Sequence, residues 1–175
     1  MTGLERNADI VHMATYAPLF AHVEGWQWRP DMIWFDNLNS VRTVSYYVQQ
    51  LYGHHKGTNV LSLMMNKKPV TGAEGQNGLF ASAVYDKNKN EIIVKVANTS
   101  DRTQPLSLKF EGLKKQDVLS GGRCIKLRSA DPDKDNTIEQ PSVIQPQETS
   151  VSIDGQVLSV ELEPKTFAVY IFKKG

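Results

Sequence analysis

Residues 28–37, Trp-Arg-Pro-Asp-Met-Ile-Trp-Phe-Asp-Asn, decide how the first third of the chain folds. Within this stretch, residues 31–35 form a short and nearly continuous apolar run. Such a run is typical of a strand that is buried on both faces of a parallel sheet. We therefore expect a strand that ends at the polar pair Asp36 and Asn37.

Helical patterns flank this strand on both sides. Residues 3–17 carry a broad apolar stripe, which predicts a first helix, and residues 19–23 either extend it or form a short strand. Residues 40–52 predict a second helix, with Ser40 as the N-cap and Gly53 as the stop signal. A helix–strand–helix unit of this kind is expected at the end of an α/β barrel. Since one strand cannot close a barrel, the chain is expected to be a C-terminal fragment of a larger enzyme.

The pattern changes near residue 57, where helical periodicity stops. Short β-type runs follow, separated by turn signals rich in Asp, Asn, Gly and Pro, and a polar loop over residues 129–147 interrupts them. This series of short strands separated by turns predicts an antiparallel β-sandwich. The expected strands are Val60–Met65, Leu79–Asp86, Glu91–Ala97, Leu106–Phe110, Val118–Leu127, Thr149–Ile153, Val157–Leu162 and Phe167–Phe172.

Composition excludes several classes of function. The formal net charge of +1 gives no electrostatic reason to expect nucleic acid or an anionic membrane as a partner. No apolar run approaches the ~20 residues needed to cross a bilayer.

The single cysteine, Cys124, allows no intrachain disulfide and is expected to be buried or idle. His54 and His55 are adjacent, without a further cluster of ligands, so no metal site is expected.

Four ordered motifs carry a resemblance to a known family. They are Glu-Arg-Asn-Ala-Asp-Ile-Val at 5–11, Ala-Pro-Leu-Phe at 17–20, Trp-Arg-Pro-Asp-Met-Ile-Trp-Phe at 28–35 and Ser-Tyr-Tyr-Val-Gln at 45–49. Together they resemble the C-terminal end of the α-L-arabinofuranosidases of glycoside hydrolase family 51. Residues 136–141, Asn-Thr-Ile-Glu-Gln-Pro, and residues 162–167, Leu-Glu-Pro-Lys-Thr-Phe, look like the C-terminal domain of the same family.

The resemblance implies a fold and an activity for the parent protein. It implies a (β/α)8 barrel followed by a jelly-roll-like β-sandwich, with residues 1–56 as the last α/β segment of the barrel and residues 57–175 as most of the sandwich. The parent would remove terminal α-L-arabinofuranosyl units from arabinan- or arabinoxylan-type polysaccharides, with retention and without a cofactor. The implied partners are the missing N-terminal barrel of the same protein and the polysaccharide. A bare apolar face on residues 1–56 would also favour a homo-oligomer.

The resemblance places no catalytic residue in this chain. Retaining hydrolysis uses two carboxylates roughly 5–5.5 Å apart, and in this family both are glutamates that would lie upstream of Met1. Asp36 follows a strand, where barrel chemistry takes place. No second carboxylate holds a comparable position, so Asp36 is expected to make loop hydrogen bonds instead.

Three residues are candidates for sugar contacts. Asn37 and Asn39 lie in the loop after the strand, where relatives carry a glutamine that contacts arabinose, and Asn39 is nearest to it by spacing. Turn and N-cap chemistry is the equally weighted alternative for both amides. Trp26, together with Trp28, is expected either to stack on sugar or to pack its loop onto the barrel rim, whereas Trp34 is expected in the core.

Two other functions compete with the enzyme fragment. One is a stand-alone carbohydrate-binding module, and the other is a purely structural or interaction module. All three tryptophans lie before residue 57, which argues against a stacking platform on the sandwich. The compartment is left open, although export of polysaccharide-degrading relatives favours the cell exterior or periplasm over the cytoplasm.

Overall fold

A large antiparallel sheet forms the centre of the molecule. The computed structural model describes residues 1–114, 117–131 and 133–175. The sheet has six strands in the order β11-β10-β13-β8-β7-β4, and every neighbouring pair is antiparallel. Their bounds are β4 Asn59–Leu61, β7 Leu79–Asp86, β8 Glu91–Asn98, β10 Leu119–Arg128, β11 Gln147–Ser150 and β13 Thr166–Lys174.

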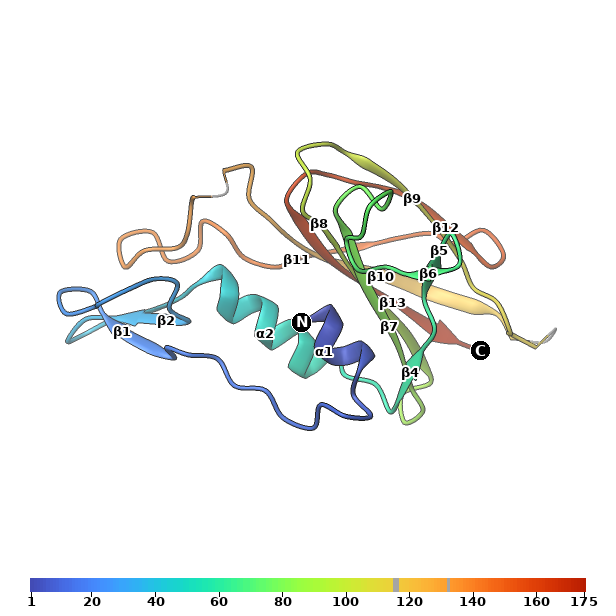
Figure 1. Cartoon of the computed structure of the whole chain (residues 1–175), viewed down its shortest axis with the longest axis horizontal. Coiled ribbons are helices and arrows are strands. Elements are labelled where there is room, and N and C mark those ends of the chain that lie inside the picture. The colour runs from blue at the N-terminus through green and yellow to red at the C-terminus, as the bar shows by residue number, and fades with distance from the viewer. Residues whose placement is uncertain (115–116, 132) are drawn as a thin grey trace.

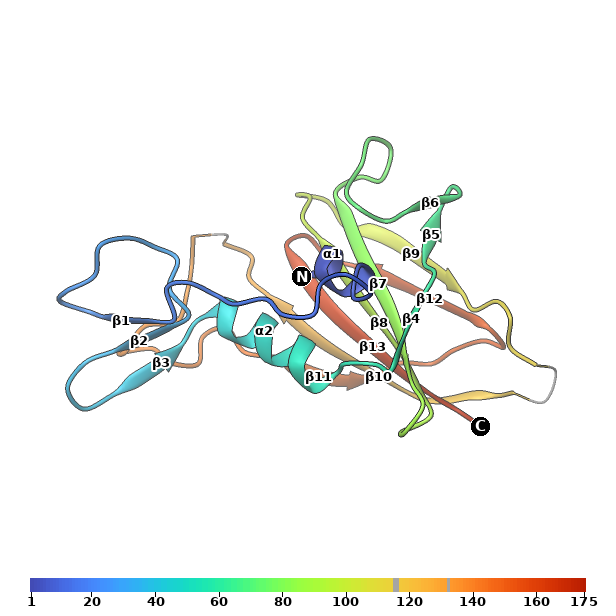
Figure 2. The same cartoon turned by 60° about the horizontal axis from the view of Figure 1, so that its bottom comes forward.

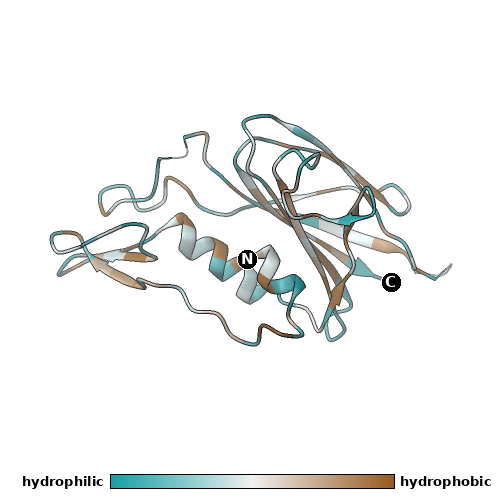
Figure 3. Cartoon of the chain, viewed as in Figure 1, coloured by the Kyte–Doolittle hydropathy of each residue, from teal (hydrophilic) through white to brown (hydrophobic). Residues whose placement is uncertain are grey.

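A second layer covers one face of this sheet. It consists of the antiparallel pair β9 (Gln104–Lys109) and β12 (Val157–Leu162), beside the short hairpin of β5 (Met64–Met65) and β6 (Lys68–Pro69). The two layers enclose an apolar core that includes Leu158, Leu162, Tyr170 and Phe172, none of which is exposed to solvent. The prediction of a mainly β, antiparallel sandwich is therefore confirmed, and Figure 3 shows the hydrophobic residues that line its strands.

The longer helix, α2 (Val44–His54), packs on the opposite face of the large sheet (Figures 1 and 2). Leu51 joins a buried cluster with side chains of β7, β8, β10 and β13, and the ring of Tyr52 stacks on Phe167 with centroids 5.5 Å apart. Strands β8 and β13 are consequently buried on both faces. Neither helix of the described residues has the length and hydrophobicity that a membrane-spanning helix requires.

The short N-terminal helix, α1 (Thr2–Arg6), docks on the same face through charged side chains. Lys95 of β8 is completely buried, and its ammonium group contacts the carboxylate of Glu5 and donates to the carbonyl of His55 at 2.7 Å. The second carboxylate oxygen of Glu5 accepts from Ser82 at 2.6 Å. Arg6 donates to the carbonyl of Ala81 at 2.9 Å. Glu5 and Arg6 of the first motif thus join α1 to the sandwich through polar contacts.

The predicted helix over residues 3–17 is wrong beyond Arg6. Asn7 forms the C-cap, and its side-chain amide donates to the carbonyl of Gly3 at 2.7 Å, which satisfies a group at the helix end. The apolar stripe that follows has little to pack against, because Ile10 is 74% and Met13 85% exposed. Since most helical stability in proteins comes from packing, residues 7–17 do not continue the helix.

The first segment contains a small three-stranded sheet, in which residues 19–23 take the strand alternative and do not extend the helix. Strand β2 (Ile33–Phe35) pairs in parallel with β1 (Phe20–His22), as expected for a parallel sheet, and antiparallel with β3 (Ser40–Arg42). The prediction of a helix from Ser40 is wrong, because Val41 is buried in this sheet and the helix begins only at Val44. The N-cap is Thr43, whose hydroxyl accepts from the backbone of Tyr46 at 3.4 Å and donates to the carbonyl of Met32 at 2.8 Å. Gly53 lies inside the helix, and the C-cap is His55.

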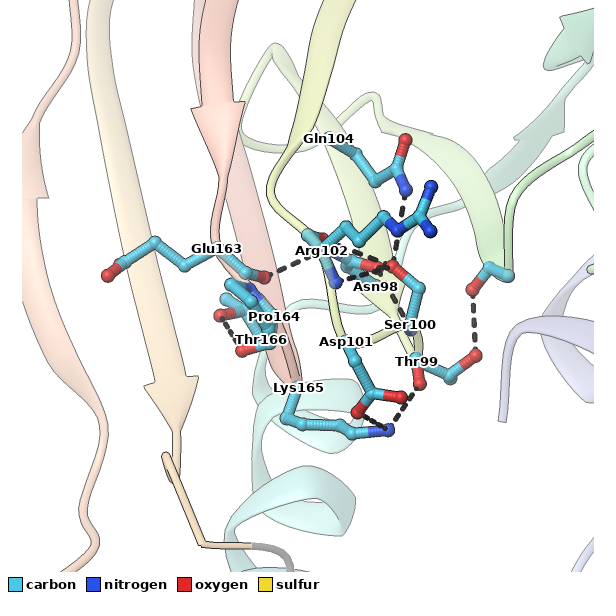
Figure 4. Close-up of polar contacts among 11 residues, drawn as sticks. Asn98, Thr99, Ser100, Asp101, Arg102, Gln104, Glu163, Pro164, Lys165 and Thr166 are labelled. Carbon is cyan, nitrogen blue, oxygen red and sulfur yellow. Dashed lines mark hydrogen bonds and ion pairs between the residues drawn. The ribbon is translucent and has the colours of Figure 1, made fainter.

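One corner of the sandwich is fixed by a buried amide at the end of β8 (Figure 4). The side chain of Asn98 donates to the carbonyls of Leu162 and Glu163, each at 3.0 Å, and accepts from the hydroxyl of Ser100 at 2.7 Å. Beside it, Lys165 donates to the carbonyl of Thr99 at 2.8 Å. The closing motif, residues 162–167, is thereby tied to the β8–β9 turn, and its Lys165 is held next to the cavity described below.

Candidate functional site

A cavity of about 1040 Å3 lies where the N-terminal segment meets the loop that follows β10. One wall comes from the β1–β2 connection, strand β2 and the first turns of α2, and the facing wall comes from the sandwich. The lining residues are Val23, Trp26, Arg29, Pro30, Asp31, Trp34, Asp36, Val44, Ser45, Val48, Leu127, Arg128, Ser129, Asp133, Lys134, Asp135, Asn136, Thr137, Ile138, Glu139, Lys165 and Phe167. Segments separated by about a hundred residues in sequence thus form one concave site.

Trp26 gives this cavity an aromatic surface. Its ring meets the buried ring of Trp34 edge-on at 5.7 Å, and the guanidinium of Arg29 lies 5.0 Å from the centroids of both rings. The contacts with Arg29 are cation–π interactions, which fix the orientation of the indole. Trp26 nevertheless remains 46% exposed, so part of its surface is free to contact a ligand. Trp28 is 66% exposed and does not line this cavity, while Trp34 is buried as predicted.

Asp36 organises the turn between β2 and β3. One carboxylate oxygen accepts from the backbone N–H groups of Leu38 at 2.7 Å and Asn39 at 2.6 Å. These hydrogen bonds, with a contribution from the Asn39 side chain, lower the pKa of the Asp36 carboxyl below its ordinary value. The loop hydrogen bonds predicted for Asp36 are therefore present.

The two candidate amides lie in this turn but not on the cavity wall. Asn37 and Asn39 are both exposed, and the amide of Asn39 donates to the two carboxylate oxygens of Asp36 at 3.3 and 3.2 Å. Among the three candidate sugar contacts, only Trp26 lines the cavity. The proposed roles of Asn37 and Asn39 stay predictions.

The facing wall is pinned to the N-terminal segment by two adjacent side chains. The buried amide of Asn136 donates to the carbonyls of Arg42 at 2.9 Å and Ile144 at 2.8 Å, and it accepts from the N–H of Ile144 at 2.8 Å. Asp135 accepts from the free N–H of Val44 at the start of α2, at 3.0 Å. Both anchors join the loop to β3 and α2, which directly follow the Asp36 turn.

A second exposed carboxylate, that of Glu139, lines the cavity from the sandwich loop. The pKa of Glu139 lies below its ordinary value, because its own backbone N–H and the side chain of Thr137 hydrogen-bond to the carboxylate. The negative charge of Asp36 acts in the opposite direction. Both are solvent-accessible acceptors on opposite walls of the cavity.

Asp31 adds a buried acceptor to the same lining. Its side chain belongs to a residue only 2% exposed, and within the described part of the chain its Oδ2 has no hydrogen-bond partner. Buried polar atoms in native proteins nearly always have a partner. An unpartnered carboxylate oxygen therefore marks a place that a further donor completes.

Cys124 and His55 do not line the cavity. Cys124 is buried in the sandwich core, as predicted, and burial raises the pKa of its thiol. Burial also lowers the pKa of His55 to about 4, with a further contribution from the positive charge of Lys95. Within residues 1–114, 117–131 and 133–175, no group of three or more His, Cys, Asp or Glu side chains is arranged to hold a metal ion.

Sequence reasoning missed the contribution of the sandwich to this site. Asp135, Asn136 and Glu139 lie about a hundred residues beyond Asp36, in a loop without regular structure. The motif over residues 136–141 was the available signal, because a defined polar motif inside an irregular loop points to fixed contacts.

The comparisons with known proteins give the family to which the chain belongs. The family model for the α-L-arabinofuranosidase C-terminal domain matches residues 1–166. The chain belongs to this family.

Relatives of the chain carry the same description. It is similar to α-L-arabinofuranosidase 1 of Arabidopsis thaliana, with 30% identity over 173 residues that cover 97% of this chain and 24% of the relative. It is also similar to an extracellular exo-α-L-arabinofuranosidase of Streptomyces chartreusis, with 42% identity over 94 residues, or 51% of this chain and 11% of the relative.

A solved structure aligns with the whole chain. It is an arabinose-bound family 51 α-L-arabinofuranosidase with a TM-score of 0.85 and 25% identity, and the alignment covers 100% of this chain and 26% of the other. The chain thus spans about a quarter of the length of the arabinofuranosidases that it matches along its full length.

Proposed function

We propose that this chain is the C-terminal part of a retaining α-L-arabinofuranosidase that removes terminal α-L-arabinofuranosyl units from arabinan- or arabinoxylan-type polysaccharides. The observation that carries the proposal is the alignment of 97% of the chain with about a quarter of a plant arabinofuranosidase. Both catalytic glutamates would precede residue 1, and the chain alone is expected to be inactive.

Within this proposal, residues 1–56 complete the barrel and residues 57–175 form the supporting sandwich. Exposed apolar side chains support this division, because Ile10, Met13 and Leu38 are 74%, 85% and 92% exposed and all belong to the first segment. Large exposed apolar groups that cluster in one segment indicate a surface that another protein part covers. The preceding barrel of the same protein is the proposed cover.

The proposed sugar contacts are Trp26, Asn37 and Asn39. Trp26 offers a partly exposed indole on the cavity wall, held by Arg29 and Trp34. Asn37 and Asn39 present amides on the exposed turn that Asp36 holds in shape. Amides and aromatic faces are the groups that orient a polar ligand in an otherwise apolar site.

Hydrolysis of 4-nitrophenyl α-L-arabinofuranoside tests the proposal. The protein encoded by the complete reading frame around this chain is expected to release nitrophenol, whereas the 175-residue chain alone is expected to release none. Turnover by the 175-residue chain that disappears in Asp36→Asn would make Asp36 catalytic and overturn the proposal. An inactive complete protein would do the same.

A further inference from the structure

The cavity has two walls, and only one of them belongs to the proposed barrel segment. The other wall is formed by residues 133–139 of the sandwich loop. These residues are held in place, since Asn136 is only 3% exposed and hydrogen-bonds to Arg42 and Ile144. Ile138 also packs on the cluster of Ala21, Trp34 and Val41. The wall is therefore fixed to the N-terminal segment by hydrogen bonds and apolar packing.

The size of the cavity indicates a ligand larger than a single sugar. Pockets of ~300–1,000 Å3 enclose drug-sized ligands, and this cavity measures about 1040 Å3. A single pentose is much smaller than such a ligand. The space therefore fits several linked sugar units better than the terminal unit alone.

The chemistry of the lining favours a neutral, hydroxyl-rich ligand. Positive side chains, namely Arg29, Arg128, Lys134 and Lys165, nearly balance the negative ones, namely Asp31, Asp36, Asp133, Asp135 and Glu139. A balanced lining offers no net attraction to a polyanion or polycation. It does offer several carboxylate acceptors for hydroxyl donors, and ionised acceptors form the stronger hydrogen bonds.

Two features show that this lining is more than a group of acidic residues. The exposed part of the Trp26 indole supplies an apolar surface for a sugar ring. Asp31 lines the same cavity with a buried carboxylate oxygen that lacks a partner within the described residues. The site thus offers an aromatic surface and a buried carboxylate oxygen that is available to accept a hydrogen bond.

We propose that residues 133–139 of the sandwich form the wall of a subsite for an arabinose-containing oligosaccharide, beyond its terminal unit. Glu139 is the specificity-determining side chain, accepting hydrogen bonds from sugar hydroxyls opposite Asp36 and Trp26. Asn136 is a positioning residue that holds this wall against β3. The inference rests on the proposed function and assigns to the sandwich a part in choosing the substrate.

Comparison of two substrates tests this subsite in the complete protein. 4-Nitrophenyl α-L-arabinofuranoside offers one sugar unit, whereas arabinotriose offers three. Glu139→Gln is expected to lower kcat/KM for arabinotriose about five- to tenfold more than for the nitrophenyl substrate, mainly through KM, because it removes the charge from an acceptor. The matched control is Glu111→Gln, whose side chain lies far along the sandwich in an exposed pair with Lys109 and is expected to change neither value.

Asn136→Ala provides a second variant, in which the positioning bonds are lost. It is expected to raise the KM for arabinotriose at a temperature where circular dichroism shows that the protein is folded. Equal effects of Glu139→Gln on both substrates, or no effect on either, would overturn the subsite while leaving the proposed function intact.

A protein that hydrolyses neither substrate would refute the proposed function, and direct binding then decides the subsite. Trp26 and Trp34 both line this cavity, so a ligand bound there is expected to change the tryptophan fluorescence. Saturable quenching of the 175-residue chain by arabinotriose, weakened in Glu139→Gln, would support the subsite. Absence of quenching would overturn it.

Discussion

Glu5→Gln is expected to be the most destabilising single charge change in this chain. The ammonium group of Lys95 has no exposed surface, and the side chain of Glu5 is 12% exposed, so the pair is effectively buried. Removal of one partner from a buried ion pair leaves an uncompensated charge and typically costs ~3–5 kcal/mol. Because the glutamine can keep the hydrogen bond from Ser82, we expect a loss of about 3 kcal/mol.

Chemical denaturation followed by far-ultraviolet circular dichroism measures this loss. In a chain of this length, about 3 kcal/mol corresponds to a fall in Tm of roughly 6–12 °C. Glu111→Gln is the matched control, because its pair with Lys109 is exposed and should contribute less than ~1 kcal/mol. The double variant Glu5→Gln/Lys95→Met should be more stable than the sum of the single losses predicts, since it removes the stranded charge.

The pH dependence of Glu5→Gln provides a separate check. Burial lowers the pKa of Lys95 in the folded protein, while the charge of Glu5 raises it, so removal of Glu5 lowers it further. Between the folded pKa and the ordinary value near ~10.4, the unfolded chain binds more protons than the folded chain. Stability of the variant should therefore recover as pH rises toward 10. A loss below 1 kcal/mol, or strictly additive single losses, would refute the buried-pair interpretation.

Three further predictions concern other buried groups. The pKa of His55 is about 4 in the folded protein, below its ordinary value of 6.5. The free energy of unfolding should therefore fall by about 1–2 kcal/mol as the pH drops from 6.5 to 4. A pH series of denaturation curves measures this fall, and His55→Gln should make it smaller. Asn98→Ala should lower the free energy of unfolding by about 2–4 kcal/mol, because it leaves the carbonyls of Leu162 and Glu163 without their buried donor. A loss below 1 kcal/mol in thermal unfolding would contradict the stabilising role of the Asn98 side chain. Cys124 should react with a thiol reagent only as fast as the protein unfolds, and rapid labelling of the folded protein would disprove its burial.

The sandwich could be predicted from sequence because its signals are local. Alternating apolar residues and turn signals placed Leu79–Asp86 and Val157–Leu162 at the bounds that the structure shows. The first segment was harder to predict, because its pattern depends on contacts outside each element. Residues 7–17 have a helical stripe but little to pack it against, and residues 40–42 join a sheet that forms only with β2.

The candidate site was predictable only in part, for a related reason. Trp26 and Asp36 flank a recognisable strand, so both could be selected from the sequence. Asn136 and Glu139 reach the cavity through an irregular loop, and no spacing rule links them to Asp36. The buried pair of Glu5 and Lys95 was also missed, because a lysine within an apolar strand does not reveal its counter-ion.

The place of β13 in the large sheet has a consequence for synthesis. This strand is the last of the sheet in chain order, yet it lies between β10 and β8 and pairs with both. A ribosome-bound chain that lacks it holds two unjoined half-sheets with exposed apolar edges. The large sheet is therefore expected to close only after residues 166–174 have left the ribosome, and until then the unpaired edges of β8 and β10 are exposed to aggregation.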